Sequence, residues 1–233
     1  MISANQALAR PGSLIYDPFV GTGSFLISSS HFGACTLGSD IDGRKQQRIK
    51  ENIEQYGMES LILGTFCGDL AHHPWRTKAK LFDAIVCDPP YGVREGAKKI
   101  TPTNDSPFKR YIVKPDILII YRNGELRYPK MEPYNMANII VDLIELSALH
   151  LKVGGRLVFW LPTVNEFNVN QDIPSHPALV LVSSSEQVFG KWSRRLITME
   201  KVSDNFDMEG LSIECKDVPS ITEFRDKYFT KSK

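Results

Sequence analysis

Short apolar runs typical of β-strands alternate with helical patterns along most of this chain, and this alternation constrains its fold more than any other feature. The predicted strands cover Ser13–Asp17, Cys35–Ile41, Leu61–Cys67, Phe82–Cys87 and Arg156–Leu161. The predicted helices cover Gly23–His31, Gly43–Tyr56 and Asn135–Leu151. Alternation at this spacing is typical of a mostly parallel sheet covered by helices on both faces, so the sequence predicts an α/β, Rossmann-like fold.

The last part of the predicted sheet has a different pattern. Two more apolar runs, Leu179–Val182 extended towards Phe189 and Trp192–Val202, are joined by a short connection that contains Gly190. This arrangement predicts a C-terminal antiparallel hairpin that closes the sheet.

Composition excludes several classes of protein. The 233 residues carry 28 Lys and Arg against 27 Asp and Glu, so a strongly basic nucleic-acid domain is excluded, and nucleic-acid binding must rest on a local patch or on another chain. There is no run of eighteen apolar residues and no signal-peptide core, and the four cysteines are widely spaced. We therefore expect a cytoplasmic protein without a membrane segment. The adjacent His72 and His73 lack further ligands at metal-binding spacing, so no metal site is expected.

Residues 94–130 interrupt the alternation with four prolines, nine basic residues and four acidic residues. We expect a single domain over residues 1–233 with a mobile basic insert at about 94–130. Its basic residues Lys98, Lys99, Lys109 and Arg110 are candidates for RNA contact, and a solvated, disordered insert is the alternative.

Two arginines at the start of the last predicted strand form a second candidate RNA surface. Arg194 and Arg195 follow Trp192, and arginines beside a tryptophan can stack on bases or contact a nucleic-acid backbone. The alternative is a solvated hairpin edge with a packed tryptophan.

A glycine-containing turn, Asp17-Pro18-Phe19-Val20-Gly21-Thr22-Gly23, follows the first predicted strand and opens the first helix. In doubly wound sheets this position binds nucleotides, and its glycines let the backbone approach a ligand closely. Leu26 stands where a dinucleotide-binding motif has its third glycine, and the acidic start of the turn repels phosphate but accepts hydrogen bonds from an amine. The turn therefore indicates a cationic or amino-acid-bearing nucleoside.

Carboxylates also follow the next two predicted strands. Asp40 ends the second strand, where a carboxylate can accept both hydroxyls of a ribose, and Asp42 competes for this role. Asp69 follows the third strand and can accept the 6-amino group of adenine. For Asp40 and Asp42 the alternative is an aspartate that caps a helix.

The four residues after the fourth predicted strand are Asp88-Pro89-Pro90-Tyr91. The two prolines make a rigid turn that presents the Asp88 carboxylate and the Pro89 carbonyl as fixed acceptors for the two hydrogens of an exocyclic amine on a base. Tyr91 offers a ring on which that base can stack. The alternative is a structural Pro-Pro turn with an exposed tyrosine.

In this order, DPFVGTGSF, GSDID, CGDL and DPPYGVRE resemble class I S-adenosylmethionine-dependent amino-methyltransferases. With GGRLVFWLPT and WSRRLITMEK included, the sequence from about Asn5 to Lys201 resembles one subfamily, the catalytic subunit of eukaryotic tRNA guanine-10 2-amino methyltransferases. The resemblance implies a seven-stranded sheet and a site for S-adenosylmethionine. It assigns to the cofactor Asp17, Pro18, Gly21, Thr22, Gly23, Asp40, Ile41, Asp69 and Asp88, and to catalysis Asp88, Pro89, Pro90 and Tyr91.

The same resemblance implies the reaction and the partners. It implies methyl transfer to the exocyclic 2-amino group of a guanine in tRNA, together with a small zinc-binding activator subunit. Family members also carry an N-terminal THUMP region that captures RNA, which we expect to be absent from this chain, leaving the catalytic domain only. The alternatives are an amino-methyltransferase that acts on DNA or another RNA, and a catalytically silent scaffold with the same fold.

Overall fold

A computed structural model of the chain describes residues 1–76, 79–91, 97–101, 131–163, 168, 172–173, 175–189 and 192–206, together with the backbone of three short strands between 111 and 127. The helices are α1 (Ile2–Gln6), α2 (Ser24–Ser30), α3 (Gln46–Tyr56) and α4 (Met136–His150), with 3-10 turns η1 (Gly43–Lys45) and η2 (Leu70–His72). The strands of the main sheet are β1 (Leu14–Asp17), β2 (Cys35–Asp40), β3 (Ile62–Cys67), β4 (Phe82–Cys87), β10 (Leu151–Thr163), β11 (Leu179–Phe189) and β12 (Trp192–Lys201).

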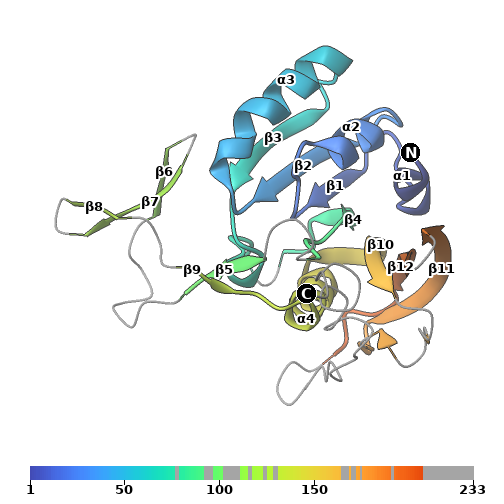
Figure 1. Cartoon of the computed structure of the whole chain (residues 1–233). Coiled ribbons are helices and arrows are strands. Elements are labelled where there is room, and N and C mark those ends of the chain that lie inside the picture. The colour runs from blue at the N-terminus through green and yellow to red at the C-terminus, as the bar shows by residue number, and fades with distance from the viewer. Residues whose placement is uncertain are drawn as a thin grey trace.

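The main sheet has seven strands in the order β11-β12-β10-β4-β1-β2-β3 (Figure 1). The pairs β1–β2, β1–β4, β2–β3 and β4–β10 are parallel, whereas β12 is antiparallel to both β10 and β11. The predicted α/β fold, with its mostly parallel sheet and C-terminal hairpin, is therefore confirmed. The structure adds that the returning strand β12 lies inside the sheet, while β11 forms the edge and runs parallel to β10.

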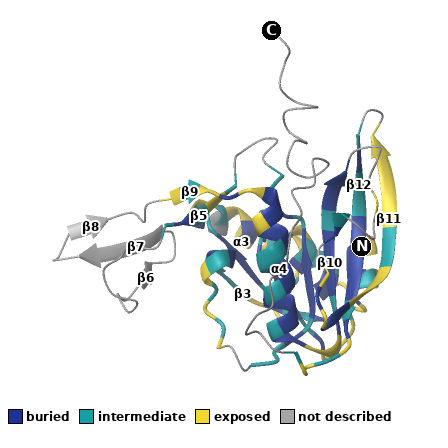
Figure 2. Ribbon diagram, turned by 90° about the horizontal axis from the view of Figure 1, so that it is seen from below, coloured by how far each residue is buried: buried dark blue, intermediate teal, exposed yellow. Residues whose placement is uncertain are grey.

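Alternating residues of the central strands face two separate apolar layers. Ile85 and Cys87 of β4 pack in the cluster that contains α4, whereas Ala84 and Val86 pack on the opposite face with Ile15. This period of two places α4 on one face of the sheet and α1, α2 and α3 on the other (Figure 1). The central strands of the sheet are buried between the helices, whereas Figure 2 shows the β11 edge as exposed.

The junction between α4 and β10 differs from the sequence prediction. The predicted strand begins at Arg156, but β10 begins at Leu151, directly after the last residue of α4. The register against β4 shifts between Leu151 and Arg156, and Gly154 in this stretch has a φ of 81°. The strand therefore contains an irregularity at the glycines that suggest a loop in the sequence.

The segment 94–130 contains strands that the sequence pattern did not predict. β5 (Lys98–Ile100) pairs antiparallel with β9 (Met131–Pro133), and β6 (Tyr111–Lys114), β7 (Ile117–Arg122) and β8 (Glu125–Arg127) form a separate three-stranded sheet. Its mobility stays a prediction. Among the described residues, no helix is both long enough and apolar enough to cross a bilayer.

Candidate active site

Three of the predicted site carboxylates lie at the same edge of the sheet. Asp17 and Asp40 are the last residues of β1 and β2, and Asp88 directly follows β4. Because β4, β1 and β2 are parallel neighbours, their carboxyl ends meet, and the negative charges of Asp40 and Asp88 both act on Asp17. The sheet topology therefore brings together residues from three separate motifs.

Asp17 is an almost completely buried carboxylate with one unpaired oxygen. Its exposure is 1%, and its Oδ1 accepts the backbone N–H of Phe19 at 2.9 Å. Its Oδ2 is buried and has no hydrogen-bond partner in the structure. Burial, together with the charges of Asp40 and Asp88, raises the pKa of Asp17 well above its ordinary value. A cationic donor placed against Oδ2 would satisfy this atom and stabilise the ionised form.

The turn after Asp17 depends on glycine at three positions. Gly21 and Gly23 have φ angles of 52° and 85°, a region that disfavours other residues. On the neighbouring strand β2, a Cβ at Gly38 would lie 2.6 Å from Cγ2 of Val20. The turn therefore packs directly against the β2 backbone. Around it, the Thr22 carbonyl accepts the side chain of Asn52 at 2.8 Å, and the Pro18 carbonyl accepts the Ser39 hydroxyl at 3.5 Å.

Asp40 and Asp42, the two candidates for the ribose contact, have different surroundings. Asp40 is buried and accepts the N–H groups of Gly21 and Asp42 at 3.0 and 2.9 Å, and Lys45 Nζ lies 3.1 Å from both of its oxygens. Asp42 lies nearer the surface and pairs with the exposed Arg44 through two hydrogen bonds of 2.8 and 2.9 Å. Only Asp40 is thus bonded to the glycine turn. Ile41 lies between them, and its carbonyl accepts the Cys67 thiol at 3.4 Å.

Asp69 has internal partners on both carboxylate oxygens. Oδ1 accepts the N–H of Ala71 at 3.1 Å, which caps η2. Oδ2 accepts the N–H of Ile100 at 2.8 Å and lies 2.9 Å from His72 Nδ1. Asp69 thus joins the end of β3 to β5, a contact that the sequence analysis missed because no local pattern reports it. Its contact with adenine stays a prediction.

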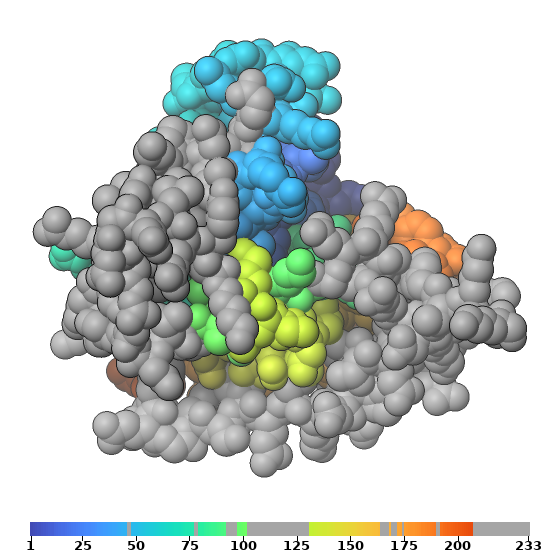
Figure 3. Space-filling model, turned by 60° about the vertical axis from the view of Figure 1, so that its left-hand side comes forward, coloured from blue at the N-terminus to red at the C-terminus, as the bar shows by residue number. Residues whose placement is uncertain are grey.

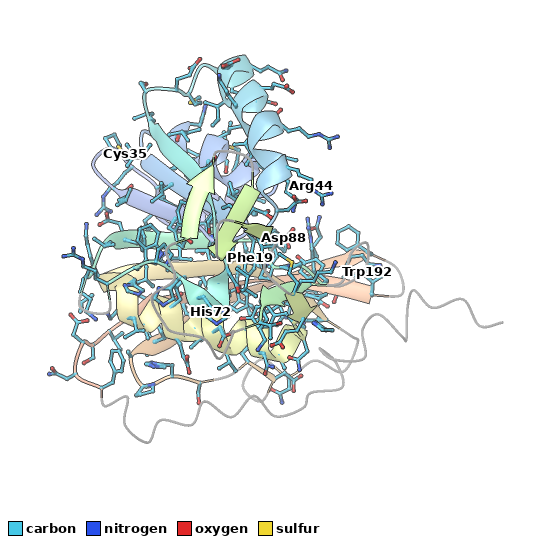
Figure 4. All side chains as sticks on the ribbon, turned by 90° about the vertical axis from the view of Figure 1, so that its left-hand side faces the viewer. Phe19, Cys35, Arg44, His72, Asp88 and Trp192 are labelled. Atoms are coloured by element: carbon cyan, nitrogen blue, oxygen red, sulfur yellow. The ribbon has the colours of Figure 1, made fainter. Side chains whose placement is uncertain are left out.

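Asp88 is the most exposed of the four carboxylates, with a side-chain exposure of 38%. Its Oδ1 is nevertheless buried without a partner, and its Oδ2 lies 4.0 Å from Nη1 of Arg194. Burial raises the pKa of Asp88 to about 6, and the charge of Arg194 opposes this shift. In Figure 4, Asp88 lies at the carboxyl ends of the central strands.

The residues after Asp88 are partly enclosed. Pro89 is buried, and Pro90 and Tyr91 are half-buried. The ring of Tyr91 packs against the core cluster that contains α4, and its buried hydroxyl has no partner. Green residues on either side of the grey gap at 92–96 come to the surface between α3 and the start of α4 (Figure 3). The use of the Tyr91 ring for base stacking stays a prediction.

The predicted RNA-contact residues lie in three different settings. Lys98 is exposed, whereas Lys99 pairs with Glu132 at 3.3 Å. Lys109 and Arg110 lie outside the described residues. Arg195 Nη2 lies 2.9 Å from Oε2 of Glu186 on the neighbouring strand, and Arg194 contacts the site itself. In the part of the chain that the structure describes, no group of three or more His, Cys, Asp or Glu side chains is placed to hold a metal ion.

A family model matches the part of the chain that carries the predicted cofactor and amine-site residues. The model of the UPF0020 family, described as an RMKL-like methyltransferase domain, matches residues 4–103, which include the glycine turn and the Asp88–Tyr91 turn. The chain is 45% identical to a tRNA (guanine(10)-N(2))-methyltransferase from Schizosaccharomyces pombe, covering 100% of this chain and 49% of the relative. It is 37% identical to the protein of the same name from Saccharomyces cerevisiae, covering 98% and 53%.

A solved structure supports the fold. TrmN from Thermus thermophilus aligns with 86% of this chain and 47% of its own, with a TM-score of 0.57 and 18% identity. At 18% identity this likeness shows a shared fold and nothing further. The chain spans about half the length of the curated relatives that it matches.

Proposed function

On the premise that this chain is a homologue of the tRNA (guanine(10)-N(2))-methyltransferases through its UPF0020 methyltransferase domain, we propose that it transfers a methyl group from S-adenosylmethionine to the exocyclic 2-amino group of a guanine in tRNA. The observation that carries the proposal is the pair of buried, unpaired carboxylate oxygens, Asp17 Oδ2 and Asp88 Oδ1, at one sheet edge. One is suited to an amino group of the cofactor and the other to an amino group of the substrate.

The residues present fit S-adenosylmethionine. Its ammonium group is a cationic donor of the kind that the unpaired Oδ2 of Asp17 requires, because a buried carboxylate is stable only when it is paired. The turn through Gly21 and Gly23 lets the backbone lie close to the methionine part, Asp40 with Ile41 would take the ribose, and Asp69 the adenine. When bound, this cofactor supplies an electrophilic methyl group.

The Asp88 turn would orient the target amine and accept its hydrogens. The lone pair of a guanine 2-amino group is delocalised into the ring, so the amine is a weak nucleophile. Asp88 and the Pro89 carbonyl would accept its two N–H groups and favour the pyramidal form, whose lone pair is available for attack. After transfer, the surplus proton would leave the nitrogen for Asp88 or for water. Tyr91 would support the base, which must leave its helix to reach this position.

The proposed partners of the protein are tRNA, as the substrate, and a small zinc-binding activator subunit. Its proposed location is the cytoplasm. RNA binding depends on basic residues, and the net charge of this chain is only +1. This charge supports an arrangement in which much of the RNA-binding surface lies outside this chain. The relatives that it matches are about twice as long, which leaves room for such a surface.

Nucleoside mass spectrometry tests the proposal. Unmodified tRNA is incubated with S-adenosylmethionine and the chain, with and without the activator, and duplex DNA is the matched substrate control. We expect a guanosine methylated on its 2-amino group in tRNA only, and none with Asp88→Ala. Methylation of DNA without methylation of tRNA would show that the substrate is DNA and not tRNA. No product from tRNA with any form of the chain, despite bound cofactor, would favour the scaffold.

A further inference from the structure

Arg194 is held in place by contacts from the two strands β10 and β11. Its guanidinium carbon lies 4.1 Å from the centre of the Trp160 ring on β10 and 5.4 Å from that of Phe189 on β11. Its Nε donates a hydrogen bond of 2.8 Å to Oε1 of Gln187. An arginine whose guanidinium lies over a tryptophan ring and whose Nε is hydrogen-bonded has little freedom to turn towards a mobile ligand.

The reversed direction of β12 brings this arginine to the catalytic edge. In the register, Arg194 lies opposite Pro162 near the carboxyl end of β10, while Phe159 of β10 lies opposite Cys87 of β4. The first residues of β12 therefore reach the edge at which the parallel strands end. As a result, Nη1 of Arg194 lies 4.0 Å from Oδ2 of Asp88, the oxygen that does not face the buried interior.

The two oxygens of Asp88 thus have separate surroundings. Oδ2 faces the cation, and Oδ1 is buried and unpaired. We propose that Arg194 is a positioning residue that keeps the Asp88 carboxylate ionised and in one orientation, with Oδ1 free for the target amine. The inference rests on the proposed function, and it gives Arg194 a role different from the RNA-backbone contact that the sequence predicts.

Electrostatics support this role. Among the described residues, Arg194 from β12 is the ionisable group whose charge lowers the pKa of Asp88. The charge of Asp88 in turn raises the pKa of Asp17 on β1 and of the buried Cys87 thiol on β4. Of these, only Arg194 is a cation. Without it, burial would favour the protonated form of Asp88, which cannot accept both an amine hydrogen and the surplus proton.

The test compares Arg194→Gln with Arg194→Lys, and Lys152→Gln is the control that removes a positive charge at the opposite end of the sheet, where Lys152 pairs with Asp83. We expect the acid limb of kcat/KM for tRNA to move to higher pH by about one pH unit in Arg194→Gln, by less in Arg194→Lys, and not at all in the control. KM for tRNA should stay within threefold. An unchanged acid limb together with a raised KM for tRNA would overturn the proposal in favour of an RNA contact.

A second readout is independent of activity. Carboxyl carbon NMR of the labelled chain, with the Asp88 signal assigned by its loss in Asp88→Asn, gives the pKa of Asp88 directly. We expect a higher pKa in Arg194→Gln than in wild type, and the same value in both would overturn the proposal. If the wild-type chain methylates no tRNA, the proposed function fails, and this titration alone decides whether Arg194 acts on Asp88.

Discussion

The backbone N–H of Gly21 donates a hydrogen bond of 3.0 Å to Oδ2 of Asp40, and this contact ties the turn after β1 to the end of β2. The other oxygen of Asp40 accepts the N–H of Asp42, so a single carboxylate organises the backbone on both sides of the edge. A turn held in this way is arranged before any ligand arrives, and binding then requires less ordering of the backbone. A ribose at Asp40 would have to replace Lys45 Nζ, which lies 3.1 Å from both carboxylate oxygens.

This contact predicts different results for the two neighbouring aspartates. Asp40→Ala removes the acceptors of two partly buried N–H groups, so we expect a loss of about 1–3 kcal/mol of unfolding free energy and at least about a tenfold loss of cofactor affinity. Asp42→Ala breaks an ion pair with the exposed Arg44 and an exposed hydrogen bond from the N–H of the same residue, and it should cost less than about 1 kcal/mol, with affinity within threefold. Urea unfolding and calorimetric titration measure both. Equal losses of affinity would show that Asp42 shares the ribose contact.

Asp17 gives the ligand-free chain a predictable dependence on pH. Because the pKa of Asp17 is raised on folding, the folded state binds its proton more tightly than the unfolded chain does. This group therefore favours folding most below its ordinary pKa of 3.8, and its contribution falls as the pH rises through that value towards the folded one. Asp88 acts in the same direction between about pH 3.8 and 6.

Asp17→Asn should remove the contribution of Asp17 to the loss of folding stability with rising pH. We expect its melting temperature to rise relative to wild type as the pH is increased from 4 to 8, while its affinity for S-adenosylmethionine falls about 10- to 100-fold through loss of a charged hydrogen bond. Thermal unfolding at each pH, with and without cofactor, measures both effects. A melting-temperature difference that does not vary with pH would mean that Asp17 is not buried as a titrating acid.

Much of the fold could be predicted from the sequence, because strand and helix patterns are local. The exceptions have physical reasons. The irregular start of β10 depends on backbone pairing with β4, and two glycines there look like a loop. The strand β7 carries a signal that the analysis missed, the apolar run from Ile117 to Tyr121, because the surrounding prolines obscured it. The site shows the same division.

The carboxylates at the strand ends could be predicted, since each follows its own strand. The contacts of Arg194 with Asp88 and of Asp69 with Ile100 could not be predicted, because each joins segments that only the tertiary structure brings together. The N-terminal helix α1 was also missed, since five residues give too short a pattern.

The close packing of the glycine turn on β2 predicts a strong effect of one methyl group. In Gly38→Ala the new Cβ would lie 2.6 and 2.9 Å from two carbons of Val20, so the turn must move. We expect a loss of about 1–3 kcal/mol of unfolding free energy and weaker cofactor binding. The control is Gly57→Ala, where the φ of 64° costs about 1 kcal/mol but nothing lies within 4 Å. Cofactor affinity should be unchanged in this control. An equal loss of cofactor affinity in both variants would show that the effect does not depend on the packing of the glycine turn.

The basic segment predicts a salt-dependent contact with RNA. The exposed Lys98 is free to meet a phosphate, whereas Lys99 pairs with Glu132 and lies 5.6 Å from the centre of the Tyr134 ring. Lys98→Gln should therefore weaken tRNA binding and reduce the slope of log affinity against log salt by about one, and Lys99→Gln should reduce it less. Neutralising Lys98, Lys99, Lys109 and Arg110 together should flatten the slope further. An unchanged slope in the fourfold variant would leave the segment without a role in RNA binding.

Asp88 provides the sharpest distinction between binding and chemistry. Asp88→Asn keeps one acceptor oxygen but loses the negative charge, so we expect kcat to fall by about 10²–10³. Asp88→Ala removes the acceptor oxygens as well as the charge, so we expect kcat to fall further. Affinity for S-adenosylmethionine should stay within threefold, because Asp17 and Asp40 remain. The wild-type rate should also fall as the pH is lowered through about 6, where Asp88 gains a proton. Single-turnover methylation and cofactor titration separate the two quantities. A large loss of cofactor affinity with an unchanged rate at saturating cofactor would show that Asp88 binds the cofactor and not the target amine.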